Sequence, residues 1–472
     1  MKSIPVKGKP CQDILDQMAD FKNQDANYMD GRTWSLVYHL SKEHDAFLKK
    51  AHGMYFSENG LNPMAFKSLK RFEHEVVQMA ADLLHGDENT VGTMTSGGTE
   101  SCLLPVMTYR EMAKSKKRVG SFSPEMIAPE SAHVAWDKAA KYFGIRMVKI
   151  PLQDDFTVDV VRLKKKITSN TIMIMASAPT YPHGVIDPIE EIGLVAEQKK
   201  IPFHVDACLG GFFLPFAEQI GHAIPKFDFR IQGVTSMSAD VHKYGFAAKG
   251  ASVLLYRNMQ ILKHQFFINQ DWPGGVFASP ALLGTRPGGP IAAAWAAMNA
   301  LGKKGYQDMA AQVMSITRQL TQGIDAIDGL EIMGTPKMGV FAYKSSTRDI
   351  NIFAVGDKME DKGWHIDRLQ RPEGLHAMVT PAHAKVVDQY LGDLKSSVDD
   401  VKANPGLGAK GNAAMYGMIA NIPFRGMIKK EVLKMMEKMY GPECEMPLDK
   451  KGQEPLAIRM GARVLNWLRR FL

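Results

Sequence analysis

The stretch SMSADVHKYGFAAK, from Ser236 to Lys249, sets the organisation of the rest of the chain. Lys243 stands in it between a histidine and a tyrosine, and a short uncharged apolar run, Ala251–Tyr256, follows. A run of this kind is typical of a buried strand. A lysine just before a core strand can be desolvated, which lowers the pKa of its amine and makes the amine nucleophilic. The alternative is that Lys243 and Lys249 are ordinary surface lysines.

An acidic residue follows a second apolar segment. Pro202–Val205, within PFHVDACLGG, is predicted to be a short strand, and Asp206 stands at its carboxyl end. Ligands bind outside this end of the strands in open α/β sheets. Asp206 is therefore a candidate for binding a ligand, and the N-cap of a helix is its alternative role.

A glycine-rich turn precedes a predicted helix. The motif TSGGTES spans Thr95–Ser101, and the helix is predicted over Glu100–Ala113. Gly97 and Gly98 allow a ligand to approach the backbone closely, and Thr99 offers a hydroxyl. Free N–H groups at the start of a helix favour an anion such as phosphate. Most GG pairs are simple turns, so this motif depends on the others for its interpretation.

A histidine is the fourth candidate ligand-binding feature. His133, in SAHVAWDKAAKYFG, precedes another predicted helix and can offer a flat ring. Pyridoxal 5'-phosphate (PLP) requires an amine for its aldehyde, an acid for its ring nitrogen, a face for its ring and a cradle for its phosphate. Lys243, Asp206, His133 and the TSGG turn supply one of each, so we predict a PLP site.

The order of six motifs resembles that of the fold-type-I PLP enzymes of the group II decarboxylase branch. Within that branch the chain is most similar to the sphingosine-1-phosphate lyase family, through Tyr38 in SLVYHL, Lys249 and two longer segments, WPGGVFASPALLGTRPGG and AAMYGMIANIPFRGM. The resemblance extends from about Tyr38 to about Gly441. The six motifs are TSGGTES, SAHVAWDKA, APTYPHGVIDPI, HVDACLGGF, SADVHKYGFAAKG and GTRPGG.

This resemblance implies a PLP-dependent aldehyde lyase. Its substrate would be a phosphorylated sphingoid base, sphingosine 1-phosphate, and cleavage of the C2–C3 bond would give a long-chain aldehyde and phosphoethanolamine. Lys243, Tyr181 and Tyr38 would be the catalytic residues, and the residues alone do not show which of them moves protons. The alternative is a group II amino-acid decarboxylase, which uses nearly the same PLP residues.

The resemblance also implies binding residues. Asn62 departs from the family pattern, where a histidine is common, although asparagine can still donate a hydrogen bond. Gly284 and Thr285 would reach the PLP phosphate of a second subunit, so the resemblance implies a homodimer with shared active sites and no metal. The PLP-binding residues would be Lys243, Asp206, His133, Gly97, Gly98, Thr99, His242, Gly284 and Thr285. The substrate phosphate would contact Lys249, Tyr38, Asn59 and Asn62.

The pattern of segments predicts an α/β fold of the PLP-dependent transferase type. Strands and helices alternate from about Val91 to about Leu301, which favours a mainly parallel sheet. We expect an N-terminal arm over residues 1–60, a large PLP-binding domain over 61–302 and a smaller α+β domain over 303–472. Predicted strands are Arg146–Ile150, Thr171–Ser177, Ile201–Asp206, Arg230–Val234 and Ala251–Tyr256, followed by GVFAYK and NIFAV.

The composition limits the classes of partner and the cell compartment that we expect for this protein. The net charge of +8 comes from dispersed lysines and arginines, which argues against nucleic acid and suits an anionic substrate. Cys11, Cys102, Cys208 and Cys444 show no paired spacing, so reduced thiols are predicted. Without a signal peptide or a segment long enough to span a bilayer, we expect a cytoplasmic protein of the soluble bacterial type. The basic amphipathic segment LAIRMGARVLNWLRRFL is predicted to be a docked helix, with peripheral membrane contact as the alternative.

Overall fold

The computed structural model describes residues 3–115, 123–421 and 425–442. The basic C-terminal segment and Cys444 therefore lie outside the described residues. Within them, Cys11, Cys102 and Cys208 are free thiols, as predicted. No helix among these residues combines the length and the apolar character that crossing a membrane requires.

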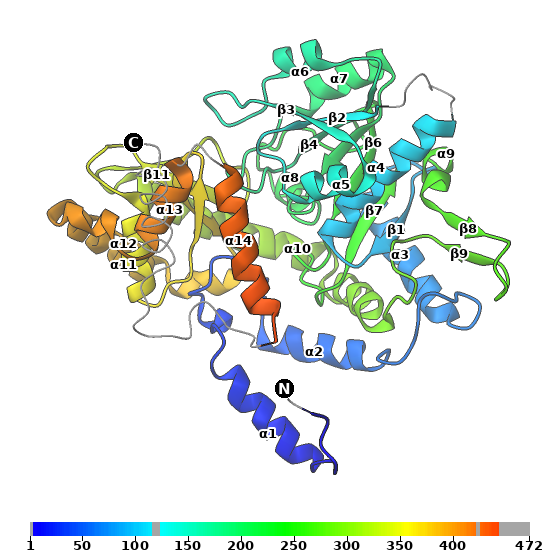
Figure 1. Ribbon diagram of the computed structural model, residues 1–472, viewed down its shortest axis with the longest axis horizontal. Coiled ribbons are helices and arrows are strands. Elements are labelled where there is room, and N and C mark those ends of the chain that lie inside the picture. The colour runs from blue at the N-terminus through cyan, green and yellow to red at the C-terminus, as the bar shows by residue number, and fades with distance from the viewer. Residues whose placement is uncertain (1–2, 116–122, 422–424, 443–472) are drawn as a thin grey trace.

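A large, mainly parallel sheet forms the body of the molecule (Figure 1), which confirms the predicted fold class. The described strands run in the order β1-β7-β6-β5-β4-β2-β3, and only β7 runs against its neighbours. The bounds are β1 Val91–Thr95, β2 Glu125–Pro129, β3 Arg146–Ile150, β4 Thr171–Ser177, β5 Phe203–Asp206, β6 Val234–Ala239 and β7 Ser252–Tyr256.

Five strands were predicted for this sheet: four of them, β3, β4, β5 and β7, are confirmed, and the fifth was misplaced. The predicted strand Arg230–Val234 is wrong, because β6 begins only at Val234 and continues through Ala239. Arg230 instead belongs to a turn, where it donates hydrogen bonds to Asp228 and Glu218. Ser236 and Ser238 can lie in a buried strand because each pairs with a ring nitrogen of His204. Buried hydroxyls that find a partner cost little.

Helices cover the large sheet (Figure 1), and α4 begins at its carboxyl edge. Glycines at the start of α4 allow this helix to begin directly after β1. The predicted helix over Ile189–Lys199 is confirmed. The helices are α3 Lys67–Leu83, α4 Gly98–Ser115, α5 Ala135–Phe143, α6 Val160–Lys166, α7 Ile189–Lys199, α8 Leu214–Gln219 and α9 Met259–Leu262.

A long helix leads from the large sheet to the second one. The helix α10 spans Gly288–Asp325, and Gly302 has a φ of 56°, which interrupts the helical backbone. A positive φ is accessible to glycine without a steric penalty. Just before α10 lies a short hairpin of β8 Phe267–Asn269 and β9 Phe277–Ser279.

The second sheet is small and antiparallel. Its strands run in the order β10-β11-β13-β12. The bounds are β10 Leu330–Ile332, β11 Val340–Ser345, β12 Asp367–Gln370 and β13 Glu373–Met378. The segment GVFAYK lies largely in β11, as predicted. Helices α11 Ile352–Asp361, α12 Val387–Ala403, α13 Gly411–Asn421 and α14 Arg425–Tyr440 complete the described C-terminal part.

The predicted strand in NIFAV is wrong, because this segment opens helix α11. The Asn351 side chain accepts hydrogen bonds from the backbone N–H groups of Phe353 and Ala354. An asparagine in this position caps a helix and removes two of its unsatisfied donors. The apolar residues that follow then pack as one face of a helix.

The N-terminal segment resembles the predicted arm in its exposure. Helix α1 (Cys11–Lys22) has no buried residue, and Figure 1 shows it projecting from the body of the molecule. The chain then returns through Trp34, which is fully buried, to helix α2 (Lys42–Gly53). The division into an arm and two domains stays a prediction.

Candidate active site

A cavity of about 240 Å³ lies at the carboxyl edge of the large sheet. Ser177 ends β4, Asp206 ends β5 and Asp240 follows β6, so neighbouring parallel strands deliver side chains to one place. Ligands of open α/β sheets bind at this edge. The cavity is lined by Gly98, Thr99, Cys102, His133, Ser177, Pro179, Tyr181, Asp206, Cys208, Leu209, Asp240, His242 and Lys243.

Asp206 is a buried carboxylate that stays ionised. Burial alone raises the pKa of Asp206, but hydrogen bonds hold that pKa below its ordinary value. Trp136 Nε1 donates to Asp206 Oδ2 at 2.9 Å, and the backbone N–H of Cys208 donates to Oδ1 at 3.1 Å. An ionised acid at this depth can keep a ring nitrogen protonated. Sequence reasoning missed Trp136, which only the packing of α5 brings to the carboxylate.

Lys243 lies in the cavity as predicted, but as a paired ammonium. Its Nζ lies 2.9 Å from Asp240 Oδ2, and Asp240 is 1% exposed. Burial by itself lowers the pKa of Lys243, but the adjacent Asp240 carboxylate raises it well above its ordinary value. The expected lowering of this pKa is therefore wrong for the site as it stands. The spacing of three residues between acid and lysine was the signal that could have identified Asp240.

The glycine turn forms a cradle that a side chain would fill. Gly97 has a φ of 146°, and a Cβ atom added to Gly98 would lie 2.6 Å from Asp240 Oδ2. His242 lies against the same turn, and its Nδ1 is 2.7 Å from the Ala251 carbonyl oxygen. Thr99, in the first turn of α4, also lines the cavity. Backbone N–H groups here are available to a phosphate.

His133 and Tyr181 face each other across the cavity wall. Their ring centroids are 5.8 Å apart in an edge-to-face arrangement. Burial lowers the pKa of His133, so the ring is neutral and suited to stacking. The Tyr181 hydroxyl donates to Asp367 Oδ2 at 3.1 Å, which brings the small sheet to the site. Sequence reasoning missed Asp367.

Lys249 and Tyr38 lie together beside Lys243. The Lys249 ammonium lies 5.2 Å from the centre of the Tyr38 ring and donates to the Leu36 carbonyl oxygen at 2.8 Å. Desolvation of the amine lowers the pKa of Lys249 to about 8, and the Lys243 charge contributes to this effect. The Tyr38 hydroxyl donates to Met378 Sδ at 3.1 Å. The arm thus reaches the lysine loop of its own chain.

Seven of the predicted residues do not line this cavity: Gly97, Tyr38, Lys249, Asn59, Asn62, Gly284 and Thr285. Asn59 binds the GTRPGG loop, since its Oδ1 accepts from Arg286 N at 3.1 Å and its Nδ2 donates to Thr285 Oγ1 at 3.3 Å. Asn62 Oδ1 accepts from the backbone N–H of Met64 and starts the turn into α3. Within one chain Asn59, Thr285 and Arg286 form a separate group.

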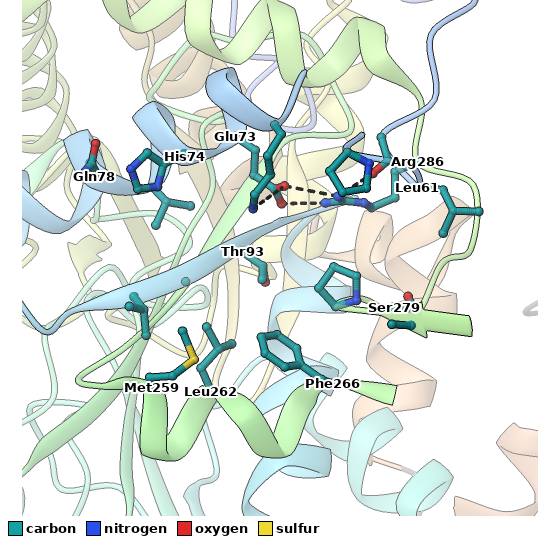
Figure 2. A pocket seen from close by; sticks show the side chains of 18 of the residues that line it. Leu61, Glu73, His74, Gln78, Thr93, Met259, Leu262, Phe266, Ser279 and Arg286 are labelled. Atoms are coloured by element: carbon teal, nitrogen blue, oxygen red, sulfur yellow. Dashed lines mark hydrogen bonds and ion pairs between the residues drawn. The ribbon is translucent and has the colours of Figure 1, made fainter. Parts of the chain in front are cut away.

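That group adjoins a second cavity of about 570 Å³, shown in Figure 2. Arg286 and Glu73 point toward each other there and are joined by ion pairs. The Glu73 and Arg286 side chains are 4% and 12% exposed, and Arg286 Nη1 lies 2.6 Å from Glu73 Oε1. This buried pair fixes the loop that carries Thr285 against α3.

The residues of the first cavity fit PLP. The cavity offers an amine on Lys243, an ionised acid on Asp206, a neutral ring on His133 and a cradle at Gly98 that only glycine permits. These groups satisfy each functional part of the cofactor. Lys243, Asp206 and His133 come from three separate segments, and the fold brings them together as predicted.

Comparisons with known proteins agree with this geometry. Residues 62–346 match the pyridoxal-dependent decarboxylase conserved domain. A sphingosine-1-phosphate lyase of Oryza sativa is 46% identical over 442 residues, which cover 92% of this chain and 81% of the rice protein. A probable sphingosine-1-phosphate lyase of Legionella pneumophila is 33% identical and covers 87% of this chain and 69% of its own length.

Comparison with solved structures indicates the same family. The Burkholderia pseudomallei sphingosine-1-phosphate lyase superposes with a TM-score of 0.83 at 35% identity, over 92% of this chain and 97% of that one. A Lactobacillus brevis glutamate decarboxylase, at 20% identity and a TM-score of 0.74 over 85% of this chain and 95% of its own, shares the fold. The chain therefore belongs to the sphingosine-1-phosphate lyase family of pyridoxal-phosphate-dependent enzymes.

Proposed function

We propose that this chain cleaves the C2–C3 bond of sphingosine 1-phosphate and releases a long-chain aldehyde and phosphoethanolamine. The observation that carries the proposal is Lys249, a cation held beside Lys243 at the site. A dianionic phosphate needs such a group, whereas an amino-acid decarboxylase has no phosphate to bind. The high identity to sphingosine-1-phosphate lyases supports the same substrate class.

The residues of the cavity would act on the amine end of the substrate. When PLP is bound, it supplies the electron sink for the pair released from the broken bond. Lys243 would hold the cofactor covalently, and Asp206 would keep its ring nitrogen protonated. His133 would stack on its ring. Gly97, Gly98, Thr99 and His242 would bind its phosphate.

Lys249 and Tyr38 would hold the substrate phosphate. In the free site the Lys249 ammonium binds the Leu36 carbonyl oxygen, which a phosphate can replace as the stronger acceptor.

Tyr38 and Tyr181 are the hydroxyl groups near Lys243 that can move a proton from the substrate hydroxyl.

We further propose a homodimer with shared active sites. Asn59, Asn62, Gly284 and Thr285 lie away from their own chain's cavity, so they would complete the site of a second subunit. Within the arm over residues 1–60, the exposed helix α1 would contact that subunit. A large domain over 61–302 and a small domain over 303–472 would follow the arm. A cytoplasmic location stays a prediction, as does a docked C-terminal helix, with membrane contact as its alternative.

A product assay tests the function. Purified protein loaded with PLP should convert sphingosine 1-phosphate to hexadecenal and phosphoethanolamine, both measured by mass spectrometry. Unphosphorylated sphingosine serves as the control, because it lacks the group that Lys249 would bind. Release of carbon dioxide from amino acids, with sphingosine 1-phosphate untouched, would establish the decarboxylase instead.

A further inference from the structure

Tyr181 is held by two residues of the small sheet. Asp367 Oδ2 accepts a hydrogen bond from the Tyr181 hydroxyl at 3.1 Å. The His376 ring lies 4.5 Å from the Tyr181 ring, at an interplanar angle of 32°. Asp367 and His376 stand directly opposite each other on β12 and β13. The position of this tyrosine in the cavity therefore depends on how the two sheets pack.

Tyr38, Lys243 and Tyr181 are the three groups that could take a proton from the substrate, and each has a different partner. The Tyr38 hydroxyl donates to the sulfur of Met378, and a thioether does not accept a proton. The Lys243 amine pairs with Asp240 at 2.9 Å in the free site and would be committed to holding the cofactor. Of the two tyrosine hydroxyls, that of Tyr181 is the one that donates to a carboxylate, Asp367.

A tyrosine in this environment cannot act as a base by itself. Burial and the Asp367 charge both raise the pKa of Tyr181, so the free phenolate is not populated near neutral pH. If the Tyr181 hydroxyl gives its own proton to a second group while it receives the proton of the substrate, the phenolate does not form. The second proton needs an acceptor at hydrogen-bond distance, and Asp367 is at that distance.

We propose that Asp367 is the positioning residue of Tyr181 and takes its hydroxyl proton as Tyr181 removes the proton from the substrate hydroxyl. The inference rests on the proposed function and deepens it. The substrate O–H electron pair becomes the second bond of the aldehyde carbonyl group. The pair of the broken carbon–carbon bond remains on the carbon that bears the amine. That carbon later receives a proton, and the return of the Asp367 proton through Tyr181 restores the starting state.

Asp367→Asn tests the proposal, because an amide keeps the size of the side chain but cannot take the proton. We expect kcat with sphingosine 1-phosphate to fall roughly 10²- to 10⁴-fold while KM changes less than about threefold. Binding of phosphoethanolamine, measured by calorimetry, should remain, as should the visible absorption of the bound cofactor. Asp367→Glu should recover part of kcat. The matched control is Asp361→Asn, an exposed acid at the end of helix α11 whose variant should behave like wild type.

A double-mutant cycle separates a shared role from two independent ones. If Asp367 acts through Tyr181, the variant with both Asp367→Asn and Tyr181→Phe should lose no more than the more damaged single variant. Losses that multiply would overturn the proposal. So would normal kcat in Asp367→Asn, a loss confined to KM, or release of the cofactor from both Asp367 variants. A wild type that leaves sphingosine 1-phosphate intact refutes the proposed function, whereas an active wild type with an unaffected Asp367→Asn refutes this inference alone.

Discussion

Replacing Lys249 by alanine should weaken the use of the phosphorylated substrate without loss of the cofactor. A hydrogen bond to a charged group contributes about 1.5–3 kcal/mol. Lys249 is exposed as a residue, so water and salt reduce the value to the lower end. A loss of about 1.5 kcal/mol corresponds to roughly a tenfold lower kcat/KM. This value is smaller than a fully desolvated ammonium would give.

The pKa of Lys249 adds a second signature. In the free site desolvation and Lys243 lower this pKa to about 8, so the ammonium loses its proton as the pH rises through that value. The substrate phosphate is dianionic above a pH of about 6. Phosphate binding should therefore be strongest between these two values, and kcat/KM of the wild type should fall above pH 8.

The assay compares three proteins across pH 6.5–9.5 with sphingosine 1-phosphate under kcat/KM conditions. Lys249→Ala should be about tenfold slower at pH 7 and should lack the decline that this group causes above pH 8. The matched control is Lys141→Ala, an exposed lysine of α5, which should follow the wild type. If Lys249→Ala matches that control within about twofold at pH 7, the phosphate role is refuted.

Three further outcomes are expected. Borohydride should fix the cofactor on the peptide that contains Lys243, and Lys243→Ala should abolish this label; a label elsewhere in the chain would contradict the assignment. Mixing inactive Lys243→Ala with inactive Thr285→Asp should restore activity after verified subunit exchange, since one hybrid site keeps both native residues; no recovery would contradict shared sites. Glu73→Gln breaks the buried pair with Arg286 and should lower the free energy of unfolding by about 3–5 kcal/mol in urea titrations. Glu75→Gln breaks a more exposed ion pair and should cost clearly less than Glu73→Gln, and equal losses would refute this reasoning. Because the pKa of Glu73 lies below its ordinary value, this stability is present at neutral pH and lost as the pH falls.

Local segments of the sequence were the most reliable guide to the fold. Thr171–Ser177 is apolar and bounded by polar residues, and it forms β4 as predicted. Two failures have the same cause, a polar residue whose partner decides the local structure. The cap at Asn351 turns an apolar run into helix α11, and the pairing of Ser236 and Ser238 with His204 allows β6 to include them.

The sequence by itself also determined most of the candidate cofactor site. Asp206, His133, Lys243 and the TSGG turn each stand next to an element whose end is fixed by neighbouring residues. In a parallel sheet those ends meet at one edge, so local patterns were sufficient to bring them together.

Only the tertiary structure decided how these groups are charged and partnered. The pKa of Lys243 depends on how close its amine lies to a buried acid, Asp240, and the spacing of three residues does not by itself show that this acid is buried. Asp367 reaches Tyr181 across 186 residues of chain, through the packing of one sheet against another. The position of Thr285 outside its own chain's cavity is likewise decided by how distant segments pack. Adjacent residues fix local backbone geometry, whereas electrostatic interactions depend on distances that arise only when distant segments pack.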